Sequence, residues 1–224
     1  MIETKHSNYK NRIFRLTLGL LLYSVGPYLN IQSNIGLAPW EAFTIGVSNI
    51  TPLSYGTILQ LTGLIILILT YFLKEKIGLG TLIDILFIGL FVNFFLSIKI
   101  VPIATNFWVG LAMLLIGQLF MAVGSYFYIG SALGCGPRDS LMVALGKTFP
   151  KVPIGIVRGV IEGTVLFIGW LLKAKVGIGT VVAVFGIGFM IECTFKFLRF
   201  DVKRIEHESL IFTIKTMLAS FKKF

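Results

Sequence analysis

Charged residues are scarce in this chain of 224 amino acids, where they make up 13% of the sequence. Hydrophobic residues make up 56%, and the mean hydropathy is +0.89. A typical soluble domain has about 25% charged residues, so this composition excludes a soluble globular protein. It indicates a polytopic membrane protein whose surroundings are the lipid bilayer.

Cysteine and histidine are nearly absent as well. Cys135 and Cys193 do not have the spacing of metal ligands, and His6 and His207 lie in the polar termini. A metal site or an acid–base enzyme therefore has almost no suitable side chains. We expect no enzymatic activity, no metal and no cofactor.

Lysine and arginine outnumber the acidic residues, and the formal net charge is +10. The basic residues lie between apolar runs rather than on one face, so this excess does not indicate nucleic-acid binding. Basic loops between apolar segments set the orientation of membrane helices. We therefore predict a membrane topology signal and no nucleic-acid partner.

The chain carries the same pattern of about 99 residues twice. The motif Gly-x-x-Pro-x-acid occurs at 36–41 and, 98 residues later, at 134–139. The motif Gly-x-Gly-Thr occurs at 78–81 and, 99 residues later, at 177–180. Internal duplication within a bilayer is typical of secondary transporters. We predict repeat one at 13–98 and repeat two at 107–198.

Six apolar stretches are long enough to span a bilayer, because a spanning helix needs about 20 residues. They cover residues 12–31, 54–73, 78–98, 107–131, 153–172 and 177–198. Two shorter stretches, 38–50 and 136–149, have a proline near their start and an acid two residues after it, which is typical of a helix start. At about 12–14 residues they are too short to span, so we expect re-entrant half-helices.

Charge placement favours the re-entrant arrangement. Each repeat then has three spans, the two repeats are inverted, and both termini lie on one side with most of the lysines and arginines. That side is cytoplasmic by the positive-inside rule, although Lys173 and Lys175 face outward. Eight spans in parallel repeats would place more positive residues outside. We predict an all-α polytopic membrane protein of two inverted repeats, each with three transmembrane helices and one short re-entrant half-helix, forming a single membrane domain over 1–224.

The segment 199–224 differs from the rest. Apolar residues such as Leu210, Ile214 and Met217 recur at helical spacing, with lysines among and after them. This pattern predicts a basic amphipathic tail on the inner membrane surface.

Two glycine-rich turns lead into the two short helices and carry acids in the first turn. A helix start has partial positive charge and can hold an anion. Glu41 and Asp139 would oppose an anion there, and they would form a coupling site if they take up a proton or face a cation. The alternative is that each acid only caps its helix, with Arg138 as a counter-charge.

Two further groups of charges interrupt apolar helices. Arg158 and Glu162 are four residues apart, so they share a helix face and can pair, either structurally or as a gate or substrate contact. Asp84 has no acidic equivalent in the second half and either reaches the surface or serves a site. Our candidate substrate- or ion-binding residues are Gly36, Pro39, Trp40, Glu41, Gly134, Gly136, Pro137, Arg138, Asp139, Arg158 and Glu162.

The paired motifs at 36–41 and 134–139, each followed by Gly-x-Gly-Thr, resemble the YczE/YyaS/YitT group of bacterial integral membrane proteins, most closely the YczE-like branch. The resemblance covers residues 13–198. Ala38 and Glu41 stand where the group has glycine and aspartate in the first motif; glutamate keeps the charge but reaches further. The resemblance implies a location in the bacterial cytoplasmic membrane.

The pattern favours a secondary transporter or permease for a small solute, coupled to a proton or another cation. The alternative is a non-transporting accessory protein that binds a partner membrane protein through its glycine-rich helix faces and its tail. The partners we expect are the bilayer and a small solute, with either a second copy of this chain or a partner membrane protein. Both termini are expected in the cytoplasm.

Overall fold

The computed structural model describes residues 9–202, 205, 207–213 and 216, and these form helices and loops without a β-strand. Both short predicted helices are present, and all the predicted long stretches are helical. The helices are α1 (Tyr9–Ser33), α2 (Pro39–Ile50), α3 (Tyr55–Phe72), α4 (Leu79–Ile98), α5 (Phe107–Ile129), α6 (Pro137–Thr148), α7 (Ile154–Leu171) and α8 (Ile178–Phe197).

Five helices in the described part of the chain are long and apolar enough to cross a membrane, namely α3, α4, α5, α7 and α8. Helix α1 has 25 residues, a length of about 37 Å at 1.5 Å per residue. It is more polar than these five helices, since it contains Ser24, Asn30 and Gln32, which are buried against the protein. The prediction that α1 is a sixth span therefore stays a prediction.

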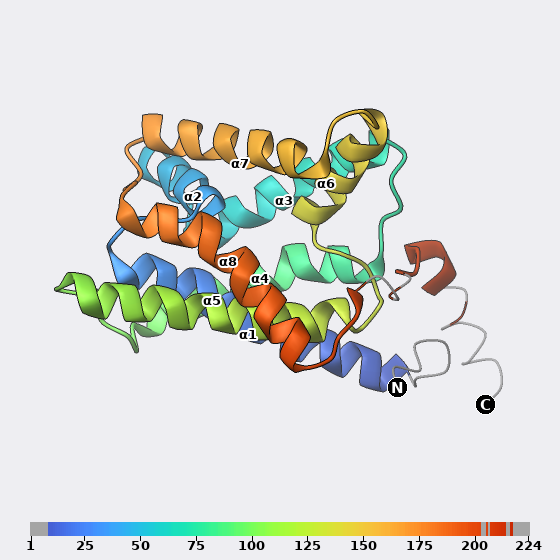
Figure 1. Cartoon of the computed structure of the whole chain (residues 1–224), viewed down its shortest axis with the longest axis horizontal. Helices are drawn as coiled ribbons and strands as arrows, with labels where there is room; N and C mark the ends of the chain where they lie inside the picture. Colours follow the sequence, from blue (N-terminus) through green and yellow to red (C-terminus); the bar gives the residue numbers. More distant parts are fainter. Residues whose placement is uncertain (1–8, 203–204, 206, 214–215, 217–224) are drawn as a thin grey trace.

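The bundle has two ends (Figure 1). What we call the N-terminal end contains the start of α1 and the loops 73–78 and 130–136, joined by a hydrogen bond from Gly80 N to Leu133 O of 2.8 Å. What we call the opposite end contains the loops 34–38, 99–106 and 172–177. There Leu37 N donates to Lys175 O at 3.0 Å.

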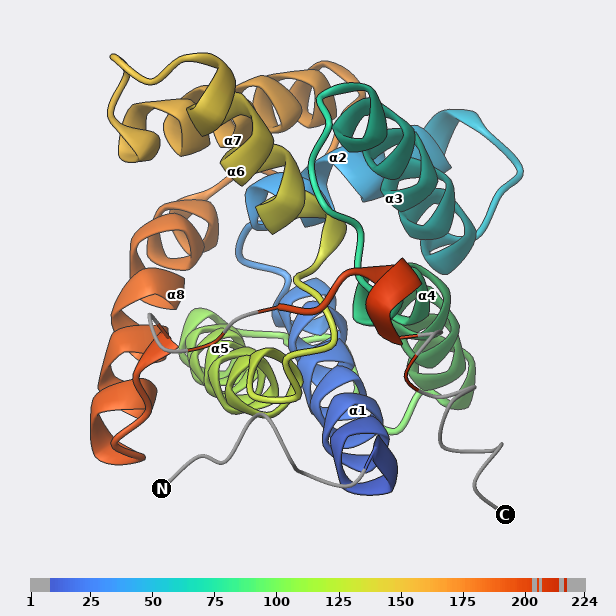
Figure 2. The same ribbon diagram turned by 90° about the vertical axis from the view of Figure 1, so that its right-hand side faces the viewer.

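Helices α1 and α5 are antiparallel and lie side by side, with α8 on one side and α4 on the other (Figure 2). Their backbones touch at two glycine pairs, Gly19 with Gly124 and Gly26 with Gly117. A Cβ added at Gly124 would lie 2.5 Å from the backbone nitrogen of Tyr23, and one at Gly26 would lie 2.9 Å from the carbonyl oxygen of Gly117. Small residues permit this close approach of helices in a bilayer.

The short helices α2 and α6 begin in the interior and run outward to opposite ends (Figure 1). Their starts meet where the guanidinium of Arg138 lies over the ring of Trp40, 4.6 Å from its centroid. The end of α2 reaches the opposite end, where Asn49 Nδ2 donates to Leu172 O at 3.4 Å. The end of α6 reaches the N-terminal end, where Lys147 Nζ lies 2.7 Å from Glu75 Oε2. Each helix has 12 residues, about 18 Å in length.

Gly36 and Gly134 precede the two short helices and have backbone φ angles of 135° and 142°. Only glycine adopts this region without strain. Each one packs against the start of a long helix of the other half. A Cβ at Gly36 would lie 2.8 Å from Thr180 N of α8, and one at Gly134 would lie 3.1 Å from Thr81 N of α4.

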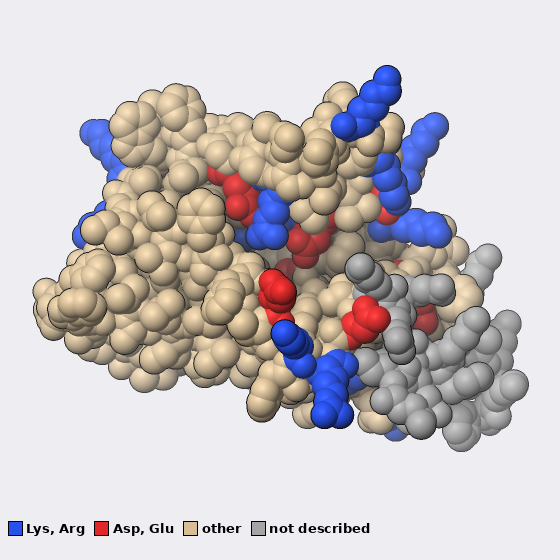
Figure 3. Space-filling view, in the orientation of Figure 1, with Lys and Arg blue, Asp and Glu red and all other residues tan. Residues whose placement is uncertain are grey.

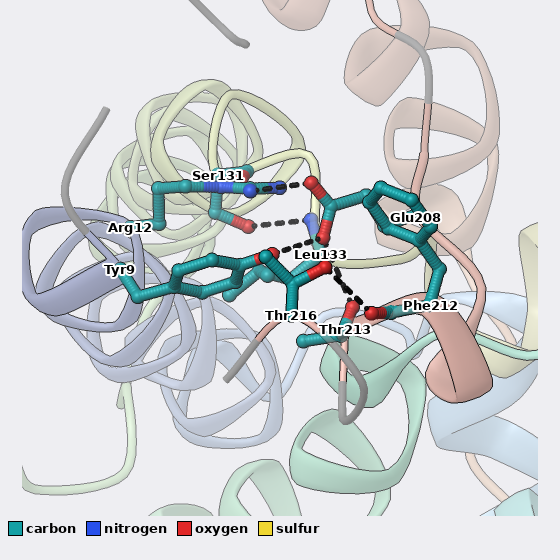
Figure 4. Close-up of polar contacts among 8 residues, drawn as sticks. All are labelled: Tyr9, Arg12, Ser131, Leu133, Glu208, Phe212, Thr213 and Thr216. Carbon is teal, nitrogen blue, oxygen red and sulfur yellow. Dashed lines mark hydrogen bonds and ion pairs between the residues drawn. The ribbon is translucent and has the colours of Figure 1, made fainter. Parts of the chain in front are cut away.

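The C-terminal segment docks across the N-terminal end of the bundle (Figure 2). Glu208 N donates to Ala132 O at 3.0 Å, and Leu210 N donates to Ile77 O at 2.8 Å. The Glu208 carboxylate also binds Arg12, as the close-up in Figure 4 shows. Half of the predicted amphipathic tail at 199–224 lies outside the described residues, so that prediction stays open.

Candidate functional site

A cavity of about 350 Å³ lies between the starts of α2 and α6 and the helices α1, α5, α7 and α8. Figure 3 shows a hollow between α7 and α8 in which acidic and basic side chains meet. Ionisable groups inside a membrane bundle are costly and usually functional. The predicted site residues that line this cavity are Pro39, Trp40, Glu41, Arg138, Asp139, Arg158 and Glu162.

The start of α2 brings Trp40 and Glu41 to the cavity. Pro39 occupies the first helical position, where its missing N–H costs nothing and its fixed φ favours the helix. Glu41 in that first turn is only 2% exposed. Its carboxylate lies close to the positive end of the α2 dipole, which stabilises an anion, and the positive charge of Arg138 acts on it.

The start of α6 brings Arg138 and Asp139 to the same place. Asp139 Oδ2 accepts a hydrogen bond from the hydroxyl of Tyr128 on α5, at 2.9 Å. Arg138 stacks on Trp40 of the other half, an arrangement in which the ring quadrupole attracts the cation. The two pseudo-equivalent acids therefore have different partners, a tyrosine for Asp139 and the neighbouring guanidinium charge for Glu41.

Helix α7 contributes an ion pair to the wall of the cavity. Arg158 Nε donates to Glu162 Oε1 at 2.8 Å, and the side chains are 48% and 21% exposed. Spacing of four residues on a helix places them together. Both side chains line the cavity, and neither is fully buried by the protein.

The other four predicted residues lie elsewhere. Gly136 and Pro137 line a second, smaller cavity of about 80 Å³ on the far side of α6, together with Arg138 and Asp139. Gly36 and Gly134 line neither cavity, because they lie in the turns that pack against α8 and α4. Their role in the structure is to set the position of the short helices.

Five polar residues of the long helices were not predicted as site residues but line the large cavity. They are Tyr23 and Asn30 of α1 and Gln118, Ser125 and Tyr128 of α5. Asn30 and Gln118 are each 1% exposed, and neither Asn30 Oδ1 nor Gln118 Oε1 has a hydrogen-bond partner among the described residues. The sequence signal that could have identified Asn30 and Gln118 is the presence of an amide side chain within an apolar helix, since burying an unpaired amide is costly.

Asp84 is buried, at 8% exposure, so it does not reach the surface. It lines the small cavity beside the start of α6, where a Cβ added at Gly136 would lie 2.7 Å from Asp84 Oδ2. The first turn of α6 therefore lies between two acids, Asp84 on one side and its own Asp139 on the other.

At the N-terminal end the large cavity reaches the C-terminal segment, where Val202 and His207 line it. Burial lowers the pKa of His207 below its ordinary value, which favours the neutral imidazole at neutral pH. Within the described part of the chain no group of three or more His, Cys, Asp and Glu side chains could hold a metal ion.

The apolar helices and the charged interior cavity define a polytopic α-helical membrane protein. The chain belongs to the family described as "Family of unknown function (DUF6198)", whose model matches residues 10–196. The resemblance to the YczE and YyaS proteins is confirmed by two relatives from Bacillus subtilis described below.

The relative called "Uncharacterized membrane protein YczE" is 29% identical over 177 residues, which cover 78% of this chain and 80% of the relative. "Uncharacterized protein YyaS" is 28% identical over 170 residues, covering 75% and 84%. An "Uncharacterized protein" of Haemophilus influenzae is 32% identical over 177 residues, covering 79% and 80%. No solved structure matches this chain.

Proposed function

We propose that this protein is a secondary transporter or permease for a small solute in the bacterial cytoplasmic membrane, with both termini in the cytoplasm. The observation that carries the proposal is the 350 Å³ cavity lined by Glu41, Arg138, Asp139, Arg158 and Glu162. A cavity of this size fits a small molecule, and its charged lining is costly in a membrane protein unless it serves a path.

The contacts between the halves support inverted repeats. Adding 98 to Gly19 gives Gly117, and adding 98 to Gly26 gives Gly124. The contact of Gly19 with Gly124 is therefore the counterpart of the contact of Gly117 with Gly26. Because α1 and α5 run antiparallel, the operation that relates them is a two-fold axis in the plane of the membrane, as in many secondary transporters.

The two acids at the half-helix starts are the proposed coupling groups. Glu41 is buried next to a helix start and has the Arg138 charge opposite it, so gain or loss of a proton there changes the local balance of charge. Asp139 is held by Tyr128. Arg138, Arg158 and Glu162 would contact the solute or control access, and the mixed signs favour a cationic or zwitterionic solute over a simple anion.

The test is transport by purified protein in proteoliposomes. The probes are sodium, potassium, alkylamines, zwitterionic amino acids, carboxylates and neutral sugars, each tested with and without a pH gradient, with uptake and internal pH recorded together. We expect uptake of one class above protein-free vesicles, and a loss of at least about tenfold in Glu41→Gln and Asp139→Asn, since each removes one ionisable group.

The matched control is Glu75→Gln, which removes a carboxylate at the N-terminal end, away from the cavity. It should keep wild-type uptake. Full uptake by Glu41→Gln and Asp139→Asn, or no uptake of any class, would remove the coupled-transport proposal and favour the accessory-protein alternative. Elution as a single species on size exclusion shows that each variant is folded.

A further inference from the structure

The small cavity and the large cavity are counterparts of each other. The small cavity is lined by residues of α3, α4 and the start of α6, and the large one by residues of α7, α8 and the start of α2. The offset of 98 or 99 relates eight residues of one lining on these elements to eight of the other. Small-cavity residues Leu59, Thr62, Gly63, Asp84, Ile85, Ile88, Pro137 and Asp139 correspond to large-cavity residues Arg158, Ile161, Glu162, Ala183, Val184, Ile187, Pro39 and Glu41.

The wall of the small cavity is closed by contact of α3 with α4. A Cβ added at Gly56 would overlap the carbonyl oxygen of Gly89, and one at Gly89 would lie 2.5 Å from the carbonyl oxygen of Gly56. Asn93 Oδ1 accepts a hydrogen bond from Gly56 N at 2.8 Å. Gln60 Nε2 donates to Leu86 O at 2.8 Å. This cavity has a volume of only about 80 Å³.

The corresponding wall of the large cavity is open. Gly155 and Gly188, the counterparts of Gly56 and Gly89, have no heavy atom within 4 Å of an added Cβ, apart from those of their own helices. The same holds for Gly159 and Gly163 of α7. Helices α7 and α8 stand apart along this face, and the cavity between them has a volume of about 350 Å³.

The open and closed pairs lie toward different ends of the bundle. The open pair joins the start of α7 to the second half of α8, and the large cavity there reaches Val202 and His207 at the N-terminal end. The closed pair joins the start of α3 to the second half of α4, toward the opposite end. The central charged groups thus lie between an open helix pair toward the N-terminal end and a closed helix pair toward the opposite end.

We propose that the two helix pairs are alternating gates: in a second state α7 closes on α8 through Gly155 and Gly188, while α3 separates from α4 at Gly56 and Gly89 and the small cavity opens to the opposite end. This inference rests on the proposed transport function and names its two access paths. We assign α8 of the same chain as the helix that packs on the exposed glycine face of α7. The reason is that the equivalent face of α3 packs against α4, the counterpart of α8.

A specific contact would stabilise the closed α7–α8 pair. Glu192 is the counterpart of Asn93 at an offset of 99, and it is exposed in this state. Gly155 lies in the first turn of α7, where backbone N–H groups have no partner within the helix. Glu192 would accept the Gly155 N–H as Asn93 accepts that of Gly56, and glycine on both helices permits the approach.

Disulfide formation tests closure directly. In full-length protein with Cys135→Ala and Cys193→Ala, Gly155→Cys and Gly188→Cys should form an intramolecular disulfide under mild oxidation in native membranes, since closure would bring their Cα atoms within about 7 Å. The control pair is Gly163→Cys with Gly188→Cys, because Gly163 is equally open but lies two turns along α7. We expect at least about fivefold more disulfide in the first pair.

A second readout tests the exchange of cavities. Thr62→Cys, in the small cavity, is added to each pair and labelled with a membrane-impermeant maleimide. Locking α7 to α8 should raise its labelling rate at least about fivefold, and reduction of the disulfide should reverse the effect.

Equal disulfide yields in the two pairs, a disulfide between two chains, or an unchanged labelling rate at Thr62→Cys would each overturn the gate proposal. None of these measurements uses a solute. The disulfide and labelling results could support the gates while Glu41→Gln and Asp139→Asn keep full transport activity. That combination would retain the two conformational states and remove only the proposed coupling role of the two acids.

Discussion

Glu208 fixes the C-terminal segment to the bundle through two side chains of α1, Tyr9 and Arg12, and also binds Thr213 of the segment itself. Arg12 Nη1 lies 2.6 Å from Glu208 Oε1, while the hydroxyls of Tyr9 and Thr213 donate to Glu208 Oε2, each at 3.0 Å. Thr213 is fully buried, and the Arg12 side chain is 6% exposed. Figure 4 shows these groups converging on one carboxylate. The segment that borders the large cavity is therefore held by a buried charge pair.

Removing this charge should release the segment. Glu208→Gln leaves the buried Arg12 guanidinium without a counter-charge, and breaking a buried pair on one side costs about 3–5 kcal/mol. The apparent melting temperature in detergent should fall by roughly 10 °C. Proteolytic cleavage within 199–213 should become faster.

The control is Glu75→Gln, whose partner Lys147 is 66% exposed. An exposed pair contributes about 0–1 kcal/mol, so this variant should melt close to the wild type. Equal shifts for the two variants would contradict a structural role of the Arg12–Glu208 pair.

At the residue scale, the charged residues of the site were predictable and Tyr128 was not. An ionisable group in an apolar helix costs so much free energy that Glu41, Asp139, Arg158 and Glu162 could be selected from the sequence, and they do line one cavity. Tyr128 could not be selected, because a tyrosine in a membrane helix is ordinary. Its importance depends on Asp139, which another element brings to it.

At the scale of elements, glycine determines which helices touch. The existence and the approximate ends of all eight helices in the described residues follow from apolar length, proline and turn residues. Which helices pack together does not follow from the sequence. A glycine such as Gly124 or Gly163 permits close approach of another helix but does not specify which helix that is. In the structure Gly124 contacts α1, and Gly163 has nothing within 4 Å of an added Cβ.

This difference gives opposite predictions for the same substitution. Gly124→Ala would place a methyl group 2.5 Å from the Tyr23 backbone nitrogen, so α1 and α5 must separate, at a cost of about 1–3 kcal/mol. Gly163→Ala fills open space and replaces glycine in a helix by the best helix former, a gain of up to about 1 kcal/mol. Melting curves in detergent should therefore shift down for Gly124→Ala and shift little or up for Gly163→Ala. A fall of equal size in both variants would show that the effect is not the α1–α5 contact.

At the scale of the whole molecule, the structure holds one of two related helix pairs open and the other closed. The sequence repeat predicts two related halves and therefore two related cavities. The repeat does not determine which of the two cavities is the larger, because a structure with either cavity enlarged is compatible with the same repeated sequence. The difference between about 350 Å³ and about 80 Å³ is a property of the conformation. A repeat with two-fold symmetry in sequence but not in conformation is what the proposed pair of alternating states would produce.

Inverted repeats also make a prediction about membrane topology, which single cysteines in a background of Cys135→Ala and Cys193→Ala can test. The informative positions are Pro52, Lys76 and Lys99, all exposed loop or helix-end residues. Asn93 of α4 bonds to Ser54 before α3, at 2.8 Å, so the α2–α3 loop and the end of α4 lie on the same side. With re-entrant α2 and α6 and a cytoplasmic N-terminus, Pro52→Cys and Lys99→Cys should react with an impermeant maleimide added to intact cells, and Lys76→Cys should not.

Eight spans in parallel repeats would reverse all three results. Lys173→Cys should react and Lys151→Cys should be protected in either topology, so these two variants are the internal controls. Helix length favours the first outcome, because the 12 residues of α2 reach about 18 Å and the hydrocarbon core is about 30 Å thick. Labelling of Lys76→Cys with protection of Pro52→Cys and Lys99→Cys would remove the two-fold axis in the membrane plane. The alternating-gate proposal would then be rejected as well, because the helix pairs α3–α4 and α7–α8 would open toward the same side of the membrane.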